Sequence, residues 1–425
     1  MVTREQVLKV LFLFFLANFS FAIIFLPLHY VNLSQSEEEK LFDYSRLRET
    51  LVAHDKSHYV GSQFPLNCNE KLVLKHLMIE KYEDVDHYQF DPSENFLNSS
   101  KRISNSALYN IVRRMPKGGL LHVHDLTICK VDTLLALSYR DYLWTCSDEN
   151  GDFKKLRFSK TIPNNQTNCV WLLLQNLRRV NGKGVVDQKL KESFLLNATK
   201  DVSWSSIRNT ISFISGMVTY KQVYAQYHMR ALEELRSDGV FYVELRSELP
   251  LLYNLDGVSG TIYDTAAILA DVVTEFKQWF PDFFGVKLIY APNRNVNDTT
   301  IDSYFEHAIK LQELHPNFFI GIDLVSQDSA GRTIKELIPK LLPFKHLLKF
   351  YMHVAETNWI GSDYDEDLYD ILLMENQRIV NSFSLINHPQ VMQNVKLNEI
   401  PVEVCPISNQ MLKLVTNFRN HPLSH

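Results

Sequence analysis

The sequence of 425 residues lacks a Cys-x-x-Cys pair, an excess of positive charge, internal repeats and low-complexity tracts. Its five cysteines are widely separated, so a zinc site made of thiolates is not expected. Lysine and arginine total 44 against 49 aspartates and glutamates, which gives a formal net charge of -5, and no basic stripe appears. The chain is therefore not expected to bind nucleic acid.

Long hydrophobic runs are also scarce, and the one candidate lies at the N-terminus. An apolar stretch from Val10 to Leu28 follows two basic residues, and small residues around Ala22 offer a cleavage site. Residues 1–22 are therefore predicted to be a signal peptide. A signal anchor is the alternative, because the apolar run continues beyond Ala22 and is nearly long enough to span a bilayer. No stable membrane span is expected once the leader is removed.

The modification signals in the rest of the chain support secretion. Five N-x-[ST] sequons lie outside the leader, at Asn32, Asn98, Asn165, Asn197 and Asn297. Cys146 and Cys169 flank a polar stretch and are the natural disulfide pair in an oxidising compartment. The sequence therefore predicts a secreted, extracellular glycoprotein.

The most informative segment reads MPKGGLLHVHD and begins at Met115. Side chains alternate between the faces of a β-strand, so His122 and His124 would point the same way and could share one metal ion. With 15 histidines in 425 residues, about half a His-x-His pair is expected by chance, so the pair is weak by itself. A second apolar run, FYMHVAET, ends in His353, and Glu356 follows three residues later. Two strand-like segments that each end in potential ligands favour a metal centre over packing.

The pattern of apolar residues divides the chain into parts. Residues 36–114 carry apolar side chains at three- and four-residue spacing, which predicts a helical arm suited to dimerisation. Residues 115–425 alternate seven continuous apolar strands with helical stretches, which is typical of a parallel sheet buried on both faces. Residues 142–199 interrupt this part as a polar insertion after the first strand.

Polar and charged residues gather at the ends of these strands, as in VELRSE, IDLVSQD and MHVAETN. Chemistry at the carboxyl ends of parallel strands is typical of the (β/α)8 barrel, an α/β fold. A doubly wound open sheet is the alternative, but no glycine-rich phosphate loop follows the first strand. The sequence therefore predicts a TIM-type barrel.

These motifs carry a resemblance to a known family. MPKGGLLHVHD resembles the first metal motif of the adenosine deaminase-related growth factors, the secreted branch of the metal-dependent adenosine and AMP deaminases. HVAET resembles the HAGET motif of that family, and VEVCPISNQMLKLVTNFRNHP resembles its stretch after strand seven. The resemblance runs from Leu41 to the last residue. It implies a homodimer that deaminates adenosine to inosine with a water molecule activated by one zinc ion.

The resemblance also implies roles for individual residues. The implied zinc ligands are His122, His124 and His353. Glu356 would donate a proton to the purine ring. The implied nucleoside contacts are Asp125 at the ribose, Trp204 along the pocket and Ser326 at the purine edge. Asp125 could instead be a capping carboxylate, and Trp204 could be a core aromatic.

The chain departs from the family at the position of a catalytic histidine. Where the family has RIGHGF, this chain reads RIVNSF, so Asn381 replaces the histidine that takes a proton from the attacking water. Asparagine cannot accept a proton at neutral pH, and loss of a general base costs about a hundred- to ten-thousandfold in rate. Val380 and Ser382 replace two glycines, which predicts a less permissive backbone. Ala355 likewise replaces the glycine of HAGET.

A second departure lies at the end of the chain. The sequence stops at His425, before the family's strand eight, whose Ser-Asp-Asp segment carries the fourth zinc ligand. We therefore expect a barrel that lacks strand eight, from a fragment or an isoform of a longer product. Two functions follow. One is a zinc-dependent adenosine deaminase with impaired catalysis, and the other is a non-catalytic, growth-factor-like protein that binds a cell-surface receptor or glycan.

Overall fold

The computed structural model describes residues 36–59, 61–87, 93–163, 169–196, 202–258, 260–327, 330–375 and 377–422. The predicted leader and the sequons at Asn32, Asn165 and Asn197 lie outside these residues. The chain divides into two compact units, Met1–Met78 and Ile79–His425. None of the described helices is long and apolar enough to cross a membrane.

The first unit is helical over most of its described part. Helix α3 (Glu37–Ser57) begins after Ser36, whose hydroxyl accepts from the Glu39 N–H at 3.3 Å. The Glu39 carboxylate accepts from the Ser36 N–H at 3.0 Å, which completes a capping box. The helix exposes large apolar side chains, among them Leu41 and Phe42. Helix α4 (Cys68–His87) begins in this unit and continues past its boundary.

Two further helices, α5 (Phe96–Asn105) and α6 (Ala107–Val112), precede the first strand of the second unit. Helix α5 begins at Asn95, whose side chain accepts from the Leu97 N–H at 3.0 Å. The described part of the segment 36–114 thus contains the helices α3 to α6. That this segment serves dimerisation stays a prediction.

The second unit is built on parallel strands that follow one another in chain order. One sheet contains, in this order, β1 (Gly118–His124), β5 (Val240–Ser247), β8 (Gly285–Tyr290) and β9 (Phe319–Ile322). Parallel bridges then join Ile322 to Phe350 and His353 to Val380. They lead to the parallel pair β10 (Ile379–Val380) and β11 (Val402–Glu403).

Seven parallel segments therefore follow one another in the described part of this unit, counting the segment 350–353. Each segment neighbours the next one in sequence, as in a (β/α)8 barrel. A doubly wound sheet would reverse its strand order, so that alternative is wrong. The predicted TIM-type α/β fold is confirmed.

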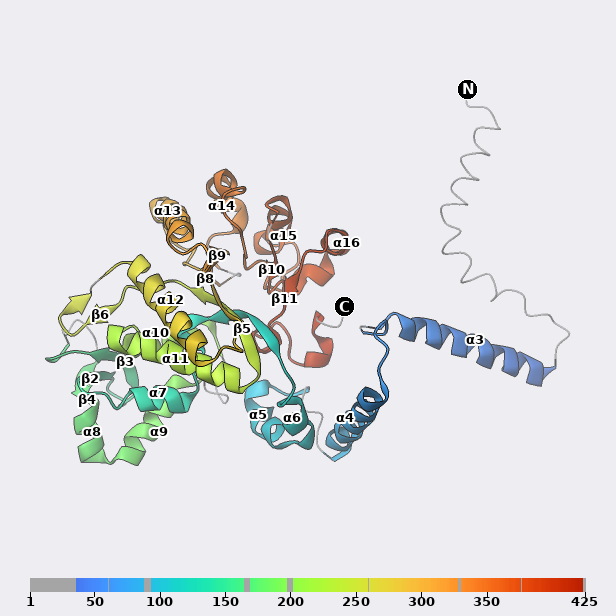
Figure 1. Cartoon of the computed structure of the whole chain (residues 1–425), viewed down its shortest axis with the longest axis horizontal. Coiled ribbons are helices and arrows are strands. Elements are labelled where there is room, and N and C mark those ends of the chain that lie inside the picture. The colour runs from blue at the N-terminus through green and yellow to red at the C-terminus, as the bar shows by residue number, and fades with distance from the viewer. Residues whose placement is uncertain are drawn as a thin grey trace, which may run out of the picture. The chain divides into compact units, whose positions relative to one another are not determined.

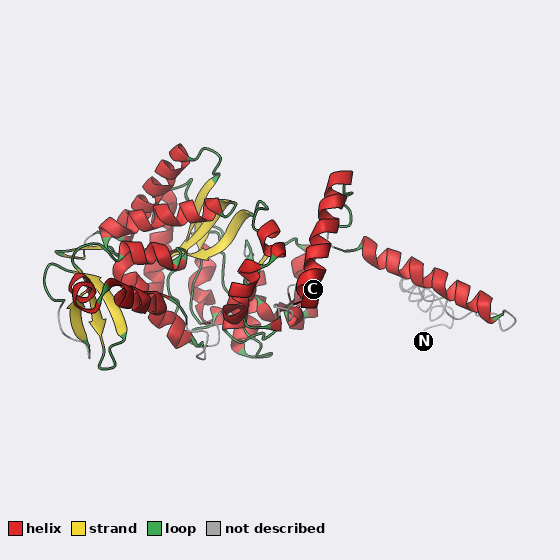
Figure 2. Cartoon of the chain, turned by 90° about the horizontal axis from the view of Figure 1, so that it is seen from below, coloured by secondary structure: helices red, strands yellow, loops and turns green. Residues whose placement is uncertain are grey.

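Helices surround these strands. In Figure 1, α12, α13, α14, α15 and α16 form an arc around the labelled strands β8 to β11, and Figure 2 shows the strands in yellow among red helices. Outside the insertion, the described α-helices after β1 are α7 (Val131–Leu137), α10 (Trp204–Val218), α11 (Lys221–Ser237), α12 (Ile262–Trp279), α13 (Asp298–Leu314), α14 (Ile334–Leu341), α15 (Asp363–Leu373), α16 (Pro389–Leu397) and α17 (Pro406–Met411). The core between helices and strands includes the fully buried Phe276, Leu288 and Phe305.

Shorter elements complete the unit. The 3-10 helices are η3 (Asp125–Thr127), η4 (Leu342–Phe344), η5 (Phe383–Asn387) and η6 (Phe418–Asn420). A small antiparallel pair, β6 (Tyr253–Asn254) and β7 (Gly257–Val258), follows β5. η3 directly follows β1 and η5 follows β10 closely, so both lie at the carboxyl ends of barrel strands.

The polar insertion after the first strand has its own secondary structure. Its antiparallel sheet has the order β3-β2-β4, with β2 (Leu143–Ser147), β3 (Phe153–Phe158) and β4 (Val170–Leu173), and α8 (Leu174–Asn181) and α9 (Lys183–Phe194) follow. In β3, Leu156 and Phe158 are buried and alternate with the exposed Lys155 and Arg157. This period of two is the sequence signal for a half-buried strand.

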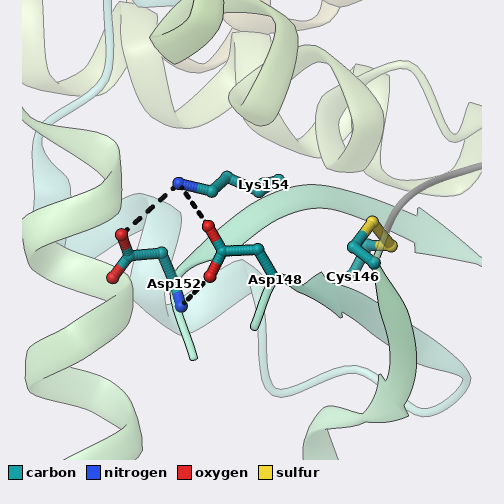
Figure 3. The surroundings of a disulfide bond; sticks show 5 residues. Cys146, Asp148, Asp152 and Lys154 are labelled. Carbon is teal, nitrogen blue, oxygen red and sulfur yellow. Dashed lines mark hydrogen bonds and ion pairs between the residues drawn. A yellow bond between two sulfur atoms is a disulfide. The ribbon is translucent and has the colours of Figure 1, made fainter. Parts of the chain in front are cut away.

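A disulfide bond closes this sheet. Cys146 of β2 pairs with Cys169, the residue before β4, and their Cα atoms are 5.5 Å apart (Figure 3). This is the pair that the sequence predicts. In the turn between β2 and β3, the Lys154 ammonium lies 3.0 Å from Asp148 and 3.4 Å from Asp152 (Figure 3). The disulfide therefore joins two strands of the insertion, and the ion pairs connect the start of β3 to the turn before it.

Candidate active site

Three histidines from distant parts of the chain meet at the carboxyl ends of the barrel strands. His122 and His124 lie at the end of β1, and a bridge to Val380 places His353 beside β10. The ring centroids are 5.3, 4.8 and 5.6 Å apart. One potential ligand nitrogen of each ring lies within 4.8 Å of the others. We call these three residues the histidine cage; that they bind zinc stays a prediction.

Buried carboxylates contact two rings of the cage at Nδ1. Glu403 Oε2 lies 2.9 Å from His122 Nδ1, and Asp323 Oδ2 lies 2.7 Å from His353 Nδ1. Burial, followed by the charges of His353 and Arg246, lowers the pKa of His122 to about 2. His122 is therefore neutral, and because Glu403 only accepts, the single ring proton lies on Nδ1. Nε2 of His122 then keeps the lone pair that a metal needs.

A charged network adjoins the cage and lies in the interior of the barrel. Arg246 lies 3.0 Å from Asp323 and 3.0 Å from Glu403, and Arg378 lies 2.9 Å from Glu403. Burial alone would raise the pKa of Asp323, but His353 and then Arg246 outweigh it and hold that pKa well below its usual value. The complete network consists of Glu244, Arg246, Asp323, Arg378 and Glu403. Three carboxylates against two guanidinium groups leave one excess negative charge, which favours a cation in the cage.

Amide groups fill the corner around Glu356. Glu356 Oε1 accepts hydrogen bonds from Asn381 Nδ2 and, at 3.0 Å, from Asn409 Nδ2. Asn409 Nδ2 also donates to Asn381 Oδ1 at 3.0 Å, and His421 Nε2 lies 2.9 Å from Asn409 Oδ1. Because an amide oxygen only accepts, His421 donates here, and the chain of bonds fixes the orientation of both amides. We call Glu356, Asn381, Asn409 and His421 the amide corner.

Several of these partners received no role from the sequence. Asp323 follows β9 in the segment IDLVSQD, one of the strand ends where charges gather. Glu403, Asn409 and His421 lie in the stretch VEVCPISNQMLKLVTNFRNHP, which carried only the family resemblance. The sequence therefore indicated only that polar residues lie at the ends of buried strands, and it did not indicate which residues they contact.

Two residues with positive φ lie in the amide corner or directly beside it. Ala355 has φ +55° and Asn381 has φ +56°, in the left-handed region that disfavours most L-residues. Ala355 stands where the family has a glycine, so the replacement introduces strain at that residue. Val380 lies in β10 and Ser382 has φ -73°, which any residue adopts. The backbone conformations of Val380 and Ser382 therefore do not need glycine.

Comparison with known proteins identifies the family. Residues 10–112 match the family model Adenosine/AMP deaminase N-terminal. An adenosine deaminase of Lutzomyia longipalpis is 35% identical over 392 residues, which cover 89% of this chain and 77% of that protein. Adenosine deaminase 2 of Homo sapiens is 31% identical over 395 residues, with the same shares covered. This chain belongs to the adenosine deaminase-related growth factor family. The resemblance of the motifs is thereby confirmed.

Solved structures share the fold at lower sequence identity. The N6-mAMP deaminase of Arabidopsis superposes with a TM-score of 0.51 and 16% identity, over 73% of this chain and 78% of that chain. A cog1816 amidohydrolase from Burkhoderia ambifaria, solved with bound Zn, has a TM-score of 0.51 and 14% identity, over 75% of this chain and 74% of that chain. These two structures support the barrel fold of the family.

The family resemblance predicts nucleoside contacts at three further positions. Asp125 is buried and accepts from Ser247 Oγ at 2.5 Å, and burial, the largest cause, raises its pKa to about 7. Trp204 is the half-buried first residue of α10. Ser326 Oγ accepts from Asn295 Nδ2 at 2.5 Å. Among the described residues, the side chains that lie close enough together to hold one metal ion are the three histidines. The nucleoside contacts stay predictions.

Two of the five sequons lie in the described part of the family fold. Asn98 is exposed in the first turn of α5. Asn297 is exposed before α13, and its Oδ1 accepts from the Thr300 N–H at 2.9 Å. Both side chains are on the surface, where a glycan can be accommodated, and their glycosylation stays a prediction.

Proposed function

We propose that this chain is a secreted protein that binds one zinc ion through His122, His124 and His353. Adenosine or a related nucleoside binds beside the metal and is deaminated to inosine slowly. The observation that carries the proposal is the cage, in which three imidazoles converge and two of them contact buried carboxylates. The predicted leader, the sequons and the Cys146–Cys169 disulfide support export.

The donor set of the cage fits zinc. A histidine must be neutral to bind a metal ion. Burial holds the pKa values of His122 and His124 well below the usual value, so both rings meet this condition. The excess negative charge of the neighbouring network offsets the charge of a divalent cation. Three protein ligands with an open position are typical of catalytic zinc sites. Zinc bound there supplies Lewis acidity.

The amide corner is the reason for slow deamination. Glu356 is the candidate donor of a proton to the purine ring. Asn381 and Asn409 donate hydrogen bonds to Glu356 Oε1, so two amide groups already occupy this oxygen of the candidate donor. Asn381 cannot take a proton from water, and a missing base costs about a hundred- to ten-thousandfold in rate. We therefore expect ligand binding without fast turnover.

The same corner favours a second candidate function, a growth-factor-like protein that acts by binding alone. In this case the partner is a cell-surface receptor or a glycan, and the nucleoside site is retained without turnover. The exposed Leu41 and Phe42 of α3 provide apolar surface for a protein partner, including a second copy of the chain. This candidate predicts a zinc-loaded protein whose biological effect is independent of inosine formation.

One experiment separates these functions. Inosine formation from adenosine is measured for the purified chain with zinc supplied, and metal content is determined on the same sample, with a chelator-treated sample as control. We expect one zinc ion per chain and turnover about a hundred-fold or more below that of adenosine deaminase 2. Turnover as fast as that enzyme contradicts impaired catalysis. Absence of zinc contradicts the cage, and zinc without any turnover supports the binding protein.

A further inference from the structure

Arg246 is the residue that connects two arms of the histidine cage. It lies on β5, it is 0% exposed, and its guanidinium reaches three other segments of the barrel. Nε lies 3.0 Å from Asp323 Oδ2, Nη2 lies 3.0 Å from Glu403 Oε2, and Nη1 donates to the Leu121 carbonyl at 3.0 Å. All three partners are immediate neighbours of a cage histidine, either in space or in sequence.

The two carboxylates use the same oxygen atoms to contact the cage. Asp323 Oδ2 accepts from Arg246 and lies 2.7 Å from His353 Nδ1, while Asp323 Oδ1 accepts from the His353 N–H at 3.1 Å. Glu403 Oε2 accepts from Arg246 and lies 2.9 Å from His122 Nδ1. The position of each imidazole is therefore tied to the position of one guanidinium.

We propose that Arg246 is the positioning residue of the metal centre: it clamps Asp323 and Glu403 and so sets the mutual orientation of His122 and His353. This inference rests on the proposed zinc site. Carboxylates that hold metal-binding histidines fix the ring orientation and raise ligand basicity. Here one side chain controls both carboxylates, so a change at Arg246 alters two ligands at once.

The shape of the guanidinium explains why arginine stands here. Its planar fork donates in several fixed directions, whereas a lysine ammonium is a compact point charge on a flexible stem. Lysine would keep the positive charge but could not reach Asp323, Glu403 and the Leu121 carbonyl in one geometry. Each carboxylate would then lose one of the contacts that orient it, and the imidazole that it holds would be oriented less strictly.

Zinc affinity tests this role independently of activity. We expect Arg246→Lys to weaken zinc binding by about 10- to 100-fold, the usual effect of losing outer-shell partners, measured by competition with a chromogenic chelator. The visible spectrum of the cobalt-substituted chain should change as well, because it reports ligand geometry. Arg178→Lys is the matched control. Arg178 is also buried, with bonds to Asp187 and Ser138, but it lies in α8 of the insertion.

The control separates positioning from a general loss of stability. Both variants lose a buried arginine fork and should lower the melting temperature, but only Arg246→Lys should change zinc affinity and the cobalt spectrum. An Arg246→Lys chain that binds zinc within threefold of the wild type overturns the inference, as does an equal loss in Arg178→Lys. A wild-type chain that binds no zinc overturns the proposed function itself.

A second variant covers the case in which Arg246→Lys does not fold. Glu403→Gln keeps the size of the side chain but removes the charge that Arg246 and His122 share. We expect a loss of zinc affinity of about tenfold or more. Where both single variants fold, the double variant should lose little more than the larger single loss, because one clamp is broken in each case. Wild-type affinity in Glu403→Gln, or fully additive losses, overturns the inference.

Discussion

The histidine cage and the amide corner are two sides of one site, and they differ in what they retain. In the cage, the three imidazoles converge and two of them are held by the buried carboxylates Asp323 and Glu403. In the corner, an amide stands where the family has a proton acceptor, and that amide donates to the candidate proton donor Glu356. The cage offers ligands for a cation, whereas the corner holds the Glu356 carboxylate in one orientation.

We infer from this difference that metal binding and proton transfer can be altered separately in this chain. The cage depends on β1, β5, β9, β11 and the segment 350–353. The corner depends on Glu356, which follows that segment, on Asn381 after β10, on Asn409 of α17 and on His421. A change in the corner leaves the groups that orient the histidines in place. A substitution in the cage or in the corner therefore tests whether the properties of the other side change.

The largest effect is expected when the missing base is put back. Asn381→His should raise the rate of inosine formation by about a hundred- to ten-thousandfold, because an imidazole can take the proton that an amide cannot. Zinc content should stay the same. The steady-state rate with adenosine is the measurement. Asn317→His, at an exposed position, is the control for adding a histidine. An unchanged rate in a zinc-loaded Asn381→His chain would show that Asn381 does not limit turnover.

Removal of a cage imidazole should affect the metal side. His353→Ala should lower zinc affinity by more than about 100-fold, since loss of an outer-shell partner alone costs 10- to 100-fold. Chelator competition gives the dissociation constant. His346→Ala removes an exposed histidine and should bind zinc as the wild type does. Equal affinities in the two variants would remove His353 from the ligand set.

A third comparison separates metal release from unfolding in acid. Burial lowers the pKa of His228 to about 4, although its ring contacts the Tyr224 carbonyl. The unfolded chain then binds more protons between pH 6.5 and 4, so the stability that neutral His228 contributes is present above pH 6.5 and is lost as pH falls through about 4. The shift corresponds to about 3 kcal/mol of unfolding free energy at most.

In the variant His228→Met, the free energy of unfolding should fall less as the pH is lowered, by up to about 3 kcal/mol. Urea unfolding at several pH values measures it, on the zinc-free chain. His346→Met, at an exposed position, should leave the slope unchanged. With His228 replaced, zinc release at low pH can be measured on a chain that stays folded, which isolates protonation of the cage. A slope identical to that of the wild type would contradict the role of His228.

The sequence predicted the barrel because the barrel depends on local patterns, whereas the grouping of His353 with His122 and His124 was implied by the family resemblance. Continuous apolar strands with polar ends indicate parallel strands, and two histidines at alternate positions of one strand must share a face. The amide corner was not predictable in this way. Its bond between Glu356 and Asn409 joins residues 53 apart in sequence, and the direction of each amide depends on the next partner, back to His421.

The antiparallel sheet of the insertion shows a different limit. The alternation of buried and exposed residues in β3 was present in the sequence, but the surrounding polar residues hid it. Tertiary contacts, namely the pairing with β2 and the disulfide at Cys146, complete that sheet. Local patterns therefore place elements, while the partners that stabilise them come from packing.

The smallest effect concerns the strain at Ala355 in the amide corner. Ala355→Gly and Ala308→Gly both remove a buried methyl group and both increase the freedom of the unfolded chain. Only Ala355 has positive φ, and a left-handed conformation costs an L-residue about 1–2 kcal/mol. Ala355→Gly should therefore be about 1–2 kcal/mol less destabilising than Ala308→Gly, which lies in α13. Denaturant unfolding measures the difference. Equal losses of stability in the two variants would mean that the left-handed conformation of Ala355 carries no strain.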